Sequence, residues 1–280
     1  MLVSVSHIRS RFVNELTGMY SREEAERIFF HILEYLCRIG RTEYFIDSGK
    51  KIPEQVCADA LMRLKNGEPW QYVTGETEFL SLRLKVDPRV LIPRPETEEL
   101  VVLIQEKHKK NPPEKILDIG TGSGAIAIAL KKFFPGSRVV AMDYSDDILE
   151  LTSTNAQLNQ VNIETFKGDI LSGRFPEQHF DLIVSNPPYV LPGEKIFMKP
   201  NVLRFEPPEA LFTPESNPIL FYRYIIDYYY QNKRGILFFE LNPATANQVA
   251  EYASTLGLHT RFYRDLSGKT RFAEIKRQWP

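Results

Sequence analysis

From residue 115 onward, the sequence alternates short apolar runs with segments of helical periodicity. This alternation is typical of a parallel sheet covered by helices. The last two runs are separated only by residues 265–270, too few for a helical crossover, so they should form an antiparallel hairpin. We therefore expect an α/β domain with a mostly parallel sheet. The expected strands cover residues 115–119, 138–142, 163–166, 180–184, 236–241, 259–264 and 271–275.

The first part of the chain, up to about residue 70, carries helical signals and almost no strand signal. Ser21 followed by Glu24 has the pattern of a capping box, and the apolar residues after it recur with helical spacing. This helix should end near Gly40. A second helix should run from Pro53, a favourable first helical residue, to Gly67, which suits a left-handed C-terminal cap. These signals predict a small helical bundle.

A change of character marks the boundary between two domains. Residues 78–86 are rich in apolar side chains that alternate with polar ones over the second half, as a hairpin requires. We expect a helical domain over residues 1–74, a hairpin linker over 75–90 and an α/β domain over 91–280.

The composition is that of an ordinary soluble globular protein, with 43% hydrophobic and 25% charged residues in 280. Lys and Arg number 35 against 36 Asp and Glu, evenly spread, which makes a nucleic-acid substrate less expected without excluding it. Cys37 and Cys57 lack the paired spacing of a zinc site and are expected to be buried or incidental thiols in a reducing compartment. The first 13 residues have no long apolar run, so we expect neither signal peptide nor membrane span, and a cytoplasmic protein.

A glycine-rich loop lies between the first expected strand of the sheet and an apolar helix. Residues 116–124 read Ile-Leu-Asp-Ile-Gly-Thr-Gly-Ser-Gly. Glycines there let the backbone turn sharply and approach a ligand, and open sheets bind ligands where their strands end. Gly120, Gly122 and Ala125 also satisfy the dinucleotide fingerprint, and Asp143 after the next strand can hold ribose hydroxyls in either case. The loop alone leaves the cofactor ambiguous.

Two acidic residues favour S-adenosylmethionine over a dinucleotide. Asp118 directly precedes the loop, where a carboxylate would orient the amino-acid end of a cationic cofactor and repel a pyrophosphate. Asp169 follows the third strand, where it would hydrogen-bond an adenine amino group beside an apolar wall at Ile170. Each acid alone is more often a turn or capping residue. Together, at the carboxyl ends of consecutive strands, they predict the cofactor cleft of a class I methyltransferase.

The fourth strand ends in Ser-Asn-Pro-Pro-Tyr at residues 185–189. This turn suits an amino or amide nitrogen as nucleophile, because the N–H groups of such a nitrogen become stronger donors as it attacks a methyl group. The Asn186 side-chain oxygen and the Pro187 carbonyl can accept these N–H bonds and stabilise the transition state more than the ground state. Tyr189 can pack on the flat face of the amide or base. No metal or strong general base is required, and the five scattered histidines predict no metal site.

Taken together, these motifs resemble those of the protein-glutamine methyltransferases that modify peptide chain release factors, over nearly the whole chain. The resemblance rests on the glycine loop, the Asn-Pro-Pro-Tyr run, the segment 91–98 (Leu-Ile-Pro-Arg-Pro-Glu-Thr-Glu), and Gly67-Glu68-Pro69, Gly75 and Glu78-Phe79. It implies a Rossmann-like class I methyltransferase fold with a seven-stranded sheet, a terminal antiparallel hairpin, an N-terminal helical bundle and a hairpin linker. In such a protein, residues 1–74 would be the substrate-recognition domain and residues 91–280 the S-adenosylmethionine-dependent methyltransferase domain. It also implies that S-adenosylmethionine methylates the glutamine of the Gly-Gly-Gln motif in class 1 release factors, supporting translation termination.

The resemblance also assigns roles to individual residues. Asn186, Pro187 and Tyr189 would be catalytic, and together with Pro188 and Arg94 they would bind the substrate. The expected cofactor-binding residues are Asp118, Gly120, Thr121, Gly122, Ser123, Gly124, Asp143, Asp169, Ile170 and Asn186. Ile170 departs from the family, since some members have an aromatic residue there.

Several residues and alternatives stay open at this point. For Arg94 and Glu96, interdomain packing is as plausible as a substrate role. Arg204 lies in a long Pro-rich segment, residues 190–218, that could close over the substrate, and Glu240 is assigned no role because Asn242 stands where a glycine is expected. A glutamine methyltransferase of a ribosomal protein, an adenine-amino methyltransferase of DNA or RNA, and a non-catalytic release-factor-binding module remain alternatives. A tyrosine-rich stretch, residues 222–230, is expected to be a helix packed on the sheet.

Overall fold

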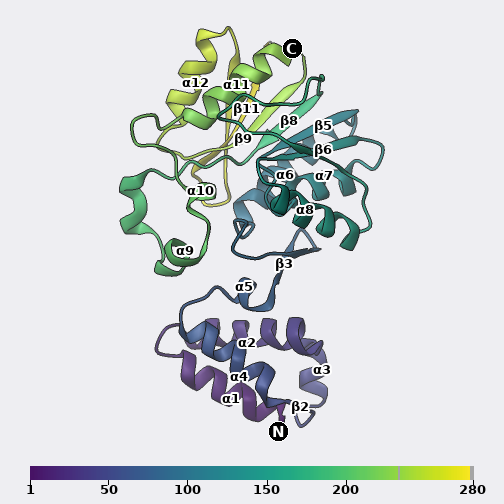
Figure 1. Cartoon of the computed structure of the whole chain (residues 1–280), viewed down its shortest axis with the longest axis vertical. Helices are drawn as coiled ribbons and strands as arrows, with labels where there is room; N and C mark the ends of the chain where they lie inside the picture. The colour runs from purple at the N-terminus through teal and green to yellow at the C-terminus, as the bar shows by residue number, and fades with distance from the viewer. Residues whose placement is uncertain (233, 278–280) are drawn as a thin grey trace. The chain divides into compact units, whose positions relative to one another are not determined.

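The computed structural model describes residues 1–232 and 234–277 and divides into two compact units (Figure 1). The first unit comprises Met1–Thr77 together with Lys199–Phe205. The second unit comprises the rest of the chain from residue 78 onward, and the expected end of the catalytic domain, residues 278–280, lies outside the described residues. A short segment from the later part of the sequence therefore groups with the N-terminal unit, which the sequence did not indicate.

The first unit is a helical bundle around its own apolar core. Ser21 caps its second helix by accepting a hydrogen bond from the Glu24 backbone N–H (3.2 Å), as the capping-box pattern predicts. That helix ends at Cys37, and Arg38 follows in the left-handed region (φ 57°), so Gly40 instead caps the start of the next helix. The helices are α1 (Val5–Leu16), α2 (Arg22–Cys37), α3 (Arg41–Ile46), α4 (Glu54–Lys65) and α5 (Trp70–Thr74).

Two short strands in this unit were not expected. Strand β1 (Leu2–Ser4) pairs antiparallel with β2 (Lys51–Pro53). Three-residue strands are too short to show an alternating pattern, so the sequence carries no signal for them. The second predicted helix begins at Glu54, because Pro53 is the N-cap rather than the first helical residue. The N-terminal residues thus belong to a strand and to the buried face of α1.

A hairpin follows, as predicted over residues 78–86, but it begins two residues earlier. It consists of β3 (Glu76–Phe79) and β4 (Leu82–Lys85). Leu80 and Ser81 at the turn both have positive φ (47° and 63°), the conformation of a two-residue type I′ turn. Its apolar side chains join the core of the second unit.

The second unit is built on a seven-stranded sheet with the order β10-β11-β9-β8-β5-β6-β7. Strands β5 to β9 are parallel to one another where they pair. Strand β11 is antiparallel to both β9 and β10, which confirms the terminal antiparallel hairpin. The bounds are β5 (Lys115–Ile119), β6 (Arg138–Asp143), β7 (Glu164–Lys167), β8 (Leu182–Ser185), β9 (Ile236–Glu240), β10 (His259–Arg264) and β11 (Thr270–Lys276).

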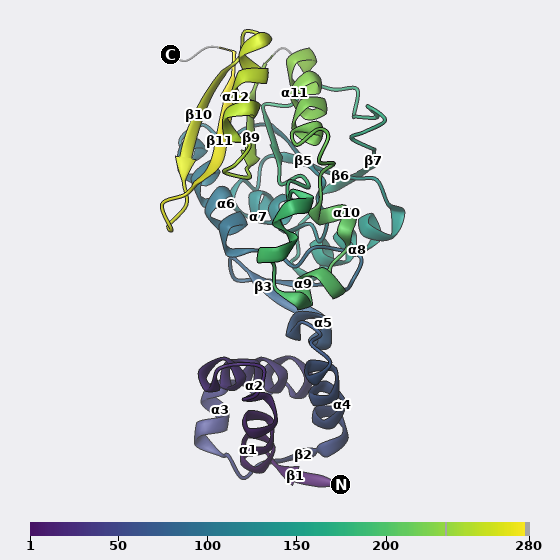
Figure 2. The same ribbon diagram turned by 90° about the vertical axis from the view of Figure 1, so that its left-hand side faces the viewer.

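Helices cover both faces of this sheet. Because side chains alternate along a strand, Leu182 and Val184 pack into one apolar cluster while Ile183 packs into the other. Figure 1 shows α6, α7 and α8 on one side of the sheet, and Figure 2 views the side covered by α11 and α12. The bounds are α6 (Pro95–His108), α7 (Ala125–Phe133), α8 (Asp146–Leu158), α11 (Leu220–Asn232) and α12 (Ala246–Thr255). Helix α11 holds the tyrosine-rich stretch, with Tyr222 and Tyr229 buried against the sheet, as expected.

The Pro-rich segment after β8 is not an unstructured loop. It forms a 3₁₀ helix, η1 (Pro192–Phe197), and two short helices, α9 (Pro200–Phe205) and α10 (Pro208–Leu211). Each of them has proline in its first turn, where the missing N–H removes no helical hydrogen bond. Across the part of the chain that the structure describes, none of the helices is long and apolar enough to cross a membrane.

Candidate active site

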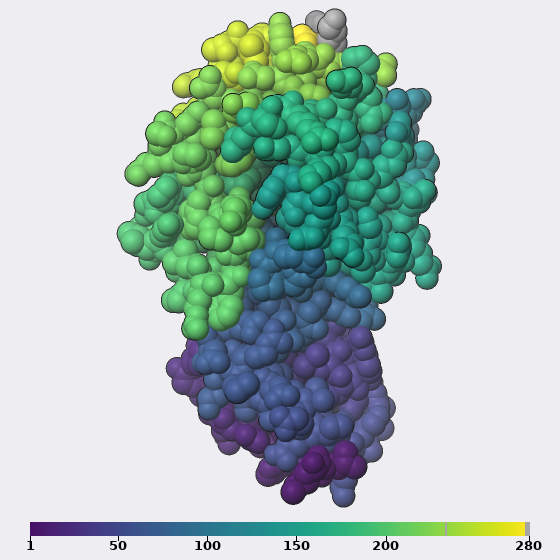
Figure 3. All heavy atoms as spheres, viewed as in Figure 1, coloured from purple at the N-terminus to yellow at the C-terminus, as the bar shows by residue number. Residues whose placement is uncertain are grey.

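A cleft of about 350 Å³ opens in the second unit at the carboxyl ends of the parallel strands. In Figure 3 the teal and green segments that contribute to its walls meet on the visible face. The cleft contains most of the residues predicted from the sequence. These are Gly120, Thr121, Gly122, Ser123, Asp143, Asp169, Ile170, Asn186 and Pro188. The other predicted residues, Asp118, Gly124, Pro187, Tyr189 and Arg94, do not line it.

The glycine loop owes its shape to three glycines and to helix α8. Gly120, Gly122 and Gly124 have positive φ (73°, 54° and 83°), which side chains with a Cβ rarely adopt. At Gly124 a Cβ would lie 2.9 Å from the Thr152 methyl carbon. The Thr152 hydroxyl donates to the Gly122 carbonyl (2.8 Å). The loop is therefore fixed by the helix that packs beside it.

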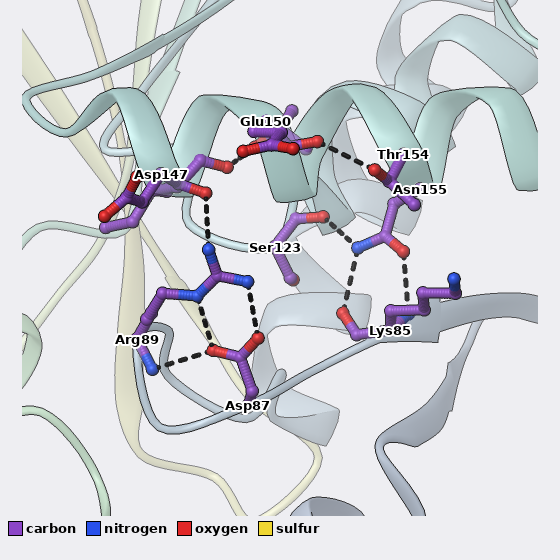
Figure 4. Close-up of polar contacts among 10 residues, drawn as sticks. Lys85, Asp87, Arg89, Ser123, Asp147, Glu150, Thr154 and Asn155 are labelled. Atoms are coloured by element: carbon purple, nitrogen blue, oxygen red, sulfur yellow. Dashed lines mark hydrogen bonds and ion pairs between the residues drawn. The ribbon is translucent and has the colours of Figure 1, made fainter.

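Asn155 of helix α8 joins the glycine loop to the hairpin (Figure 4). Its Nδ2 donates to the Ser123 carbonyl (2.8 Å) and to the Lys85 carbonyl (2.9 Å). Its Oδ1 accepts from the Lys85 N–H (2.7 Å). The nitrogen and the oxygen of this fully buried amide thus both bond to backbone groups of β4 and the loop.

Asp118 lies behind the loop rather than in the cleft. Its Oδ2 accepts hydrogen bonds from the Thr121 hydroxyl (2.6 Å) and the Ala127 N–H (3.2 Å). Oδ1 has no hydrogen-bond partner among the described residues, and the side chain is fully buried. Burial raises the pKa of Asp118 to about 7. This placement differs from the expected contact with the cofactor, because the side chain faces helix α7 and ties the loop to that helix.

The buried Asp118 carboxyl predicts a pH-dependent stability. Its folded pKa lies above the ordinary value of 3.8, so its contribution is complete below about pH 4 and is lost as the pH rises through 7. We expect the contribution of Asp118 to the free energy of unfolding to fall by roughly 1–4 kcal/mol over this range, and Asp118→Asn to remove this part of the pH dependence. Urea unfolding followed by circular dichroism at several pH values measures it, with the exposed Asp169→Asn as matched control. Equal slopes in wild type and Asp118→Asn would contradict the assignment.

Asp143 and Asp169 stand at the ends of neighbouring strands, as predicted. Asp143 Oδ2 accepts from the Gly122 N–H (3.0 Å) and Oδ1 from the Tyr144 N–H (2.8 Å). Burial raises the pKa of Asp143, while these backbone N–H groups oppose the shift. Asp169 is exposed at the rim, with Oδ1 accepting from the Leu171 N–H (2.9 Å), and Ile170 beside it is half-buried.

Asn186 lies at the other wall of the cleft, directly after β8. Its Nδ2 donates to the Thr97 hydroxyl (3.2 Å). The Tyr189 hydroxyl donates to Glu240 Oε1 (2.9 Å). Burial, reinforced by the Glu240 charge, raises the pKa of the Tyr189 phenol, which therefore stays protonated. The cleft is thus a nucleoside-sized cavity lined in part by an amide that can accept hydrogen bonds.

Known proteins resemble the chain in sequence. Residues 97–199 match the family described as "Methyltransferase small domain". The release factor glutamine methyltransferase of Flavobacterium psychrophilum is 38% identical over 280 residues, covering 97% of this chain and 98% of that protein. The protein of the same name from Bacteroides thetaiotaomicron is 35% identical, covering 98% of this chain and 100% of its own length. The chain belongs to the release factor glutamine methyltransferase family.

Solved structures agree with the fold. A methyltransferase from Pyrococcus furiosus superposes with a TM-score of 0.51 at 22% identity and covers 70% of this chain and 88% of that chain. The sheet, its terminal antiparallel strands and the covering helices are those of a class I methyltransferase, as predicted.

The segment 91–98, whose sequence resembles this family, is held by the Pro-rich segment. Glu206 is buried, accepting from Arg94 Nη2 (2.6 Å) and from the Ile92 N–H (3.2 Å). Arg94 is thus engaged in an ion pair with Glu206, not directed into the cleft. Within the first unit, Arg204 donates to the Asn66 carbonyl (3.0 Å).

The sequence patterns assign no role to four residues that surround the site in the structure. Thr97 and Glu240 contact the acceptor motif, and Thr152 and Asn155 hold the glycine loop. A weak signal existed for the last two, because polar residues on the buried face of a helix usually have a hydrogen-bonding role. Thr97 was part of the segment that resembles the family but carried no chemical signal of its own.

The residues in the cleft suit a cationic nucleoside better than a dinucleotide. Among the described residues that line it, Arg89 is the only cation. Asp87 holds the Arg89 guanidinium (2.7 and 2.9 Å), and Arg89 also donates to the Asp147 carbonyl (3.1 Å), as Figure 4 shows. A pyrophosphate would therefore meet the carboxylates of Asp143 and Asp169 with no free cation to balance it. The residues fit S-adenosylmethionine.

Proposed function

We propose that this chain transfers a methyl group from S-adenosylmethionine to the side-chain amide nitrogen of the glutamine in the Gly-Gly-Gln motif of class 1 peptide chain release factors. Acting in the cytoplasm, it would support translation termination. The observation that carries the proposal is the position of Asn186 at the wall of a nucleoside-sized cleft, in a chain with full-length relatives named release factor glutamine methyltransferase.

In this proposal the cofactor is held by the carboxyl ends of the first three parallel strands. The backbone of the glycine loop would receive its amino-acid end, as expected where a loop leads into a helix N-terminus. Asp143 would accept hydrogen bonds from the ribose hydroxyls, and Asp169 and Ile170 would contact the adenine. The sulfonium supplies an activated methyl group, so the protein needs no metal and no strong base for the transfer.

The acceptor glutamine would bind at residues 186–189. The Asn186 oxygen and the Pro187 carbonyl would accept the two N–H groups of its amide, whose positive charge develops only as the nitrogen attacks. Tyr189 would pack against the flat face of the amide. These groups act by alignment, which alone can contribute much of the rate enhancement when donor and acceptor are held in line.

We further propose that residues 1–74 recognise the release factor away from the glutamine, with residues 75–90 as the linker. This region folds around its own core and leaves large apolar side chains exposed at the end of α3, Phe45 (68% exposed) and Ile46 (81% exposed). An intact release factor should therefore be modified more efficiently than an isolated Gly-Gly-Gln peptide.

The test is methylation of a purified release factor by the full-length enzyme and S-adenosylmethionine, followed by intact-mass and peptide analysis. We expect a gain of one methyl group, located on the Gly-Gly-Gln peptide. A release factor whose motif glutamine is replaced by alanine is the matched control and should gain none.

A parallel panel of ribosomal proteins, DNA and RNA separates the alternatives. Methyl incorporation confined to a ribosomal protein would identify that protein, rather than the release factor, as the substrate. Incorporation that nuclease treatment removes would identify a nucleic acid as the substrate. Cofactor binding without turnover on any of these would indicate a binding module.

A further inference from the structure

A chain of side-chain hydrogen bonds connects the two ends of the acceptor motif through a buried carboxylate. Asn186 Nδ2 donates to Thr97 Oγ1 (3.2 Å), and Thr97 Oγ1 donates to Glu240 Oε2 (2.7 Å). The Tyr189 hydroxyl donates to the other oxygen, Glu240 Oε1 (2.9 Å). The residues come from three separate elements: the first turn of α6, the end of β8 and the end of β9. Glu240 is 1% exposed.

The carboxylate fixes the direction of every bond in this chain. Both hydroxyls donate to Glu240, one to each carboxylate oxygen, which is the arrangement that an ionised carboxylate requires because it can only accept hydrogen bonds. The Thr97 oxygen then offers only lone pairs to its other neighbour, Asn186. Only the Nδ2 of the Asn186 amide can donate a hydrogen bond to this oxygen. The amide oxygen Oδ1 therefore remains available to accept a hydrogen bond from a substrate N–H. Without this chain, the two orientations of an asparagine amide differ little in shape.

The groups around Glu240 have opposing effects on its pKa. Burial raises the pKa of Glu240, and the hydrogen bonds from the Thr97 and Tyr189 hydroxyls and the charge of Arg271 oppose this shift. Arg271 is itself paired with Asp265 (3.2 Å). Asn242, two residues after Glu240, donates to the Tyr189 carbonyl (3.1 Å), so the same segment holds both the side chain and the backbone of this tyrosine.

We propose that Glu240 and Thr97 are positioning residues that set the orientation of the Asn186 amide and so select an acceptor nitrogen that carries hydrogen. The inference rests on the proposed methyl transfer and extends it to acceptor selection. A methyl acceptor atom without hydrogen, such as a carboxylate oxygen or an unprotonated ring nitrogen, would be repelled, because its lone pair would face the lone pair of the Asn186 oxygen.

The first test compares Thr97→Val with Thr97→Ser. Valine keeps the shape of threonine but removes the hydroxyl, so we expect kcat to fall roughly 10- to 100-fold, with a smaller change in KM and in the cofactor Kd. Serine keeps the hydroxyl and should restore most of the rate. Ser137→Ala is the matched control, because it also removes a buried hydroxyl, bonded to the Pro113 carbonyl (2.5 Å), but at the opposite end of the strands.

Glu240→Gln tests the direction of these hydrogen bonds, because glutamine has nearly the same shape as glutamate but carries N–H groups. A glutamine can accept from only one of the two hydroxyls and must present N–H to the other, so kcat should fall to a similar extent. Glu240→Gln should cost less in the Thr97→Val background than in wild type, because the part of its effect that passes through the Asn186 amide is already lost there. Additive losses, or a Thr97→Val rate within twofold of wild type, would overturn the proposal.

A measurement without turnover separates this inference from the proposed function. In full-length protein labelled with ¹⁵N-asparagine, the Asn186 side-chain amide signal is identified by its loss in Asn186→Ala. We expect this signal to shift, and its hydrogens to exchange faster, in Thr97→Val and Glu240→Gln but not in Ser137→Ala. An unchanged signal in both variants overturns the inference, even where the release factor is methylated. If wild type modifies no release factor, the proposed substrate is wrong. The amide signal then decides by itself whether Thr97 and Glu240 orient the Asn186 amide.

Discussion

Replacing Asn186 by alanine is expected to lower kcat for methyl transfer at least 100-fold, while the Kd for the cofactor changes only a few fold. The reason is that the amide oxygen would accept an N–H whose donor strength grows as the acceptor nitrogen becomes positive. Removing one such preorganised group in an active site typically reduces the rate by 100- to 1,000-fold. In the proposed site the cofactor would keep its contacts with the glycine loop, Asp143 and Asp169, which line the cleft together with Asn186.

The measurement is single-turnover methylation of the release factor together with calorimetric titration of S-adenosylhomocysteine. Asn111→Ala is the matched control, because Asn111 is exposed and precedes β5, away from the carboxyl ends of the strands. Full activity in Asn186→Ala would refute the role of the amide. An equal loss of cofactor affinity and rate would instead assign Asn186 to cofactor binding.

The sequence predicted the sheet and the position of the cleft because both depend on local patterns. The short apolar run at residues 115–119 forms the buried strand β5 with the predicted bounds. The more polar strand β10 at the edge of the sheet also begins and ends at the predicted residues. The glycine loop and the Asn-Pro-Pro-Tyr turn each follow a strand directly, and parallel strands bring their carboxyl ends to one edge of the sheet. Topology alone therefore places Asp143 and Asn186 in the same cleft.

What the sequence did not predict depends on contacts between distant residues. Thr97 and Glu240 are separated by 143 positions, and nothing near either residue signals the other. Asn155 reaches Lys85 across 70 positions. Asp118 stands beside the glycine loop in sequence, yet its burial against α7 follows from the side of β5 on which it falls, and sequence proximity suggested a cofactor contact instead.

Asp143→Ala is expected to raise the Kd for S-adenosylhomocysteine roughly 50- to 100-fold. In the proposed site this carboxylate accepts hydrogen bonds from the ribose, and each hydrogen bond to a charged group contributes about 1.5–3 kcal/mol. The same carboxylate also accepts from the Gly122 N–H (3.0 Å) and so helps to shape the loop on which the cofactor rests. Both losses weaken binding, whereas kcat at saturating cofactor should fall less.

Two further variants separate the ribose contact from the support of the loop. Asp143→Asn keeps one side-chain oxygen, which can still accept from either the ribose or Gly122, so we expect an intermediate Kd, about tenfold above wild type. Asp146→Ala is the matched control, because this exposed carboxylate begins helix α8 outside the cleft lining and should leave the Kd unchanged. If Asp143→Ala binds the cofactor as tightly as wild type, the ribose must be held elsewhere, and the end of β6 would then serve only to fix the glycine loop.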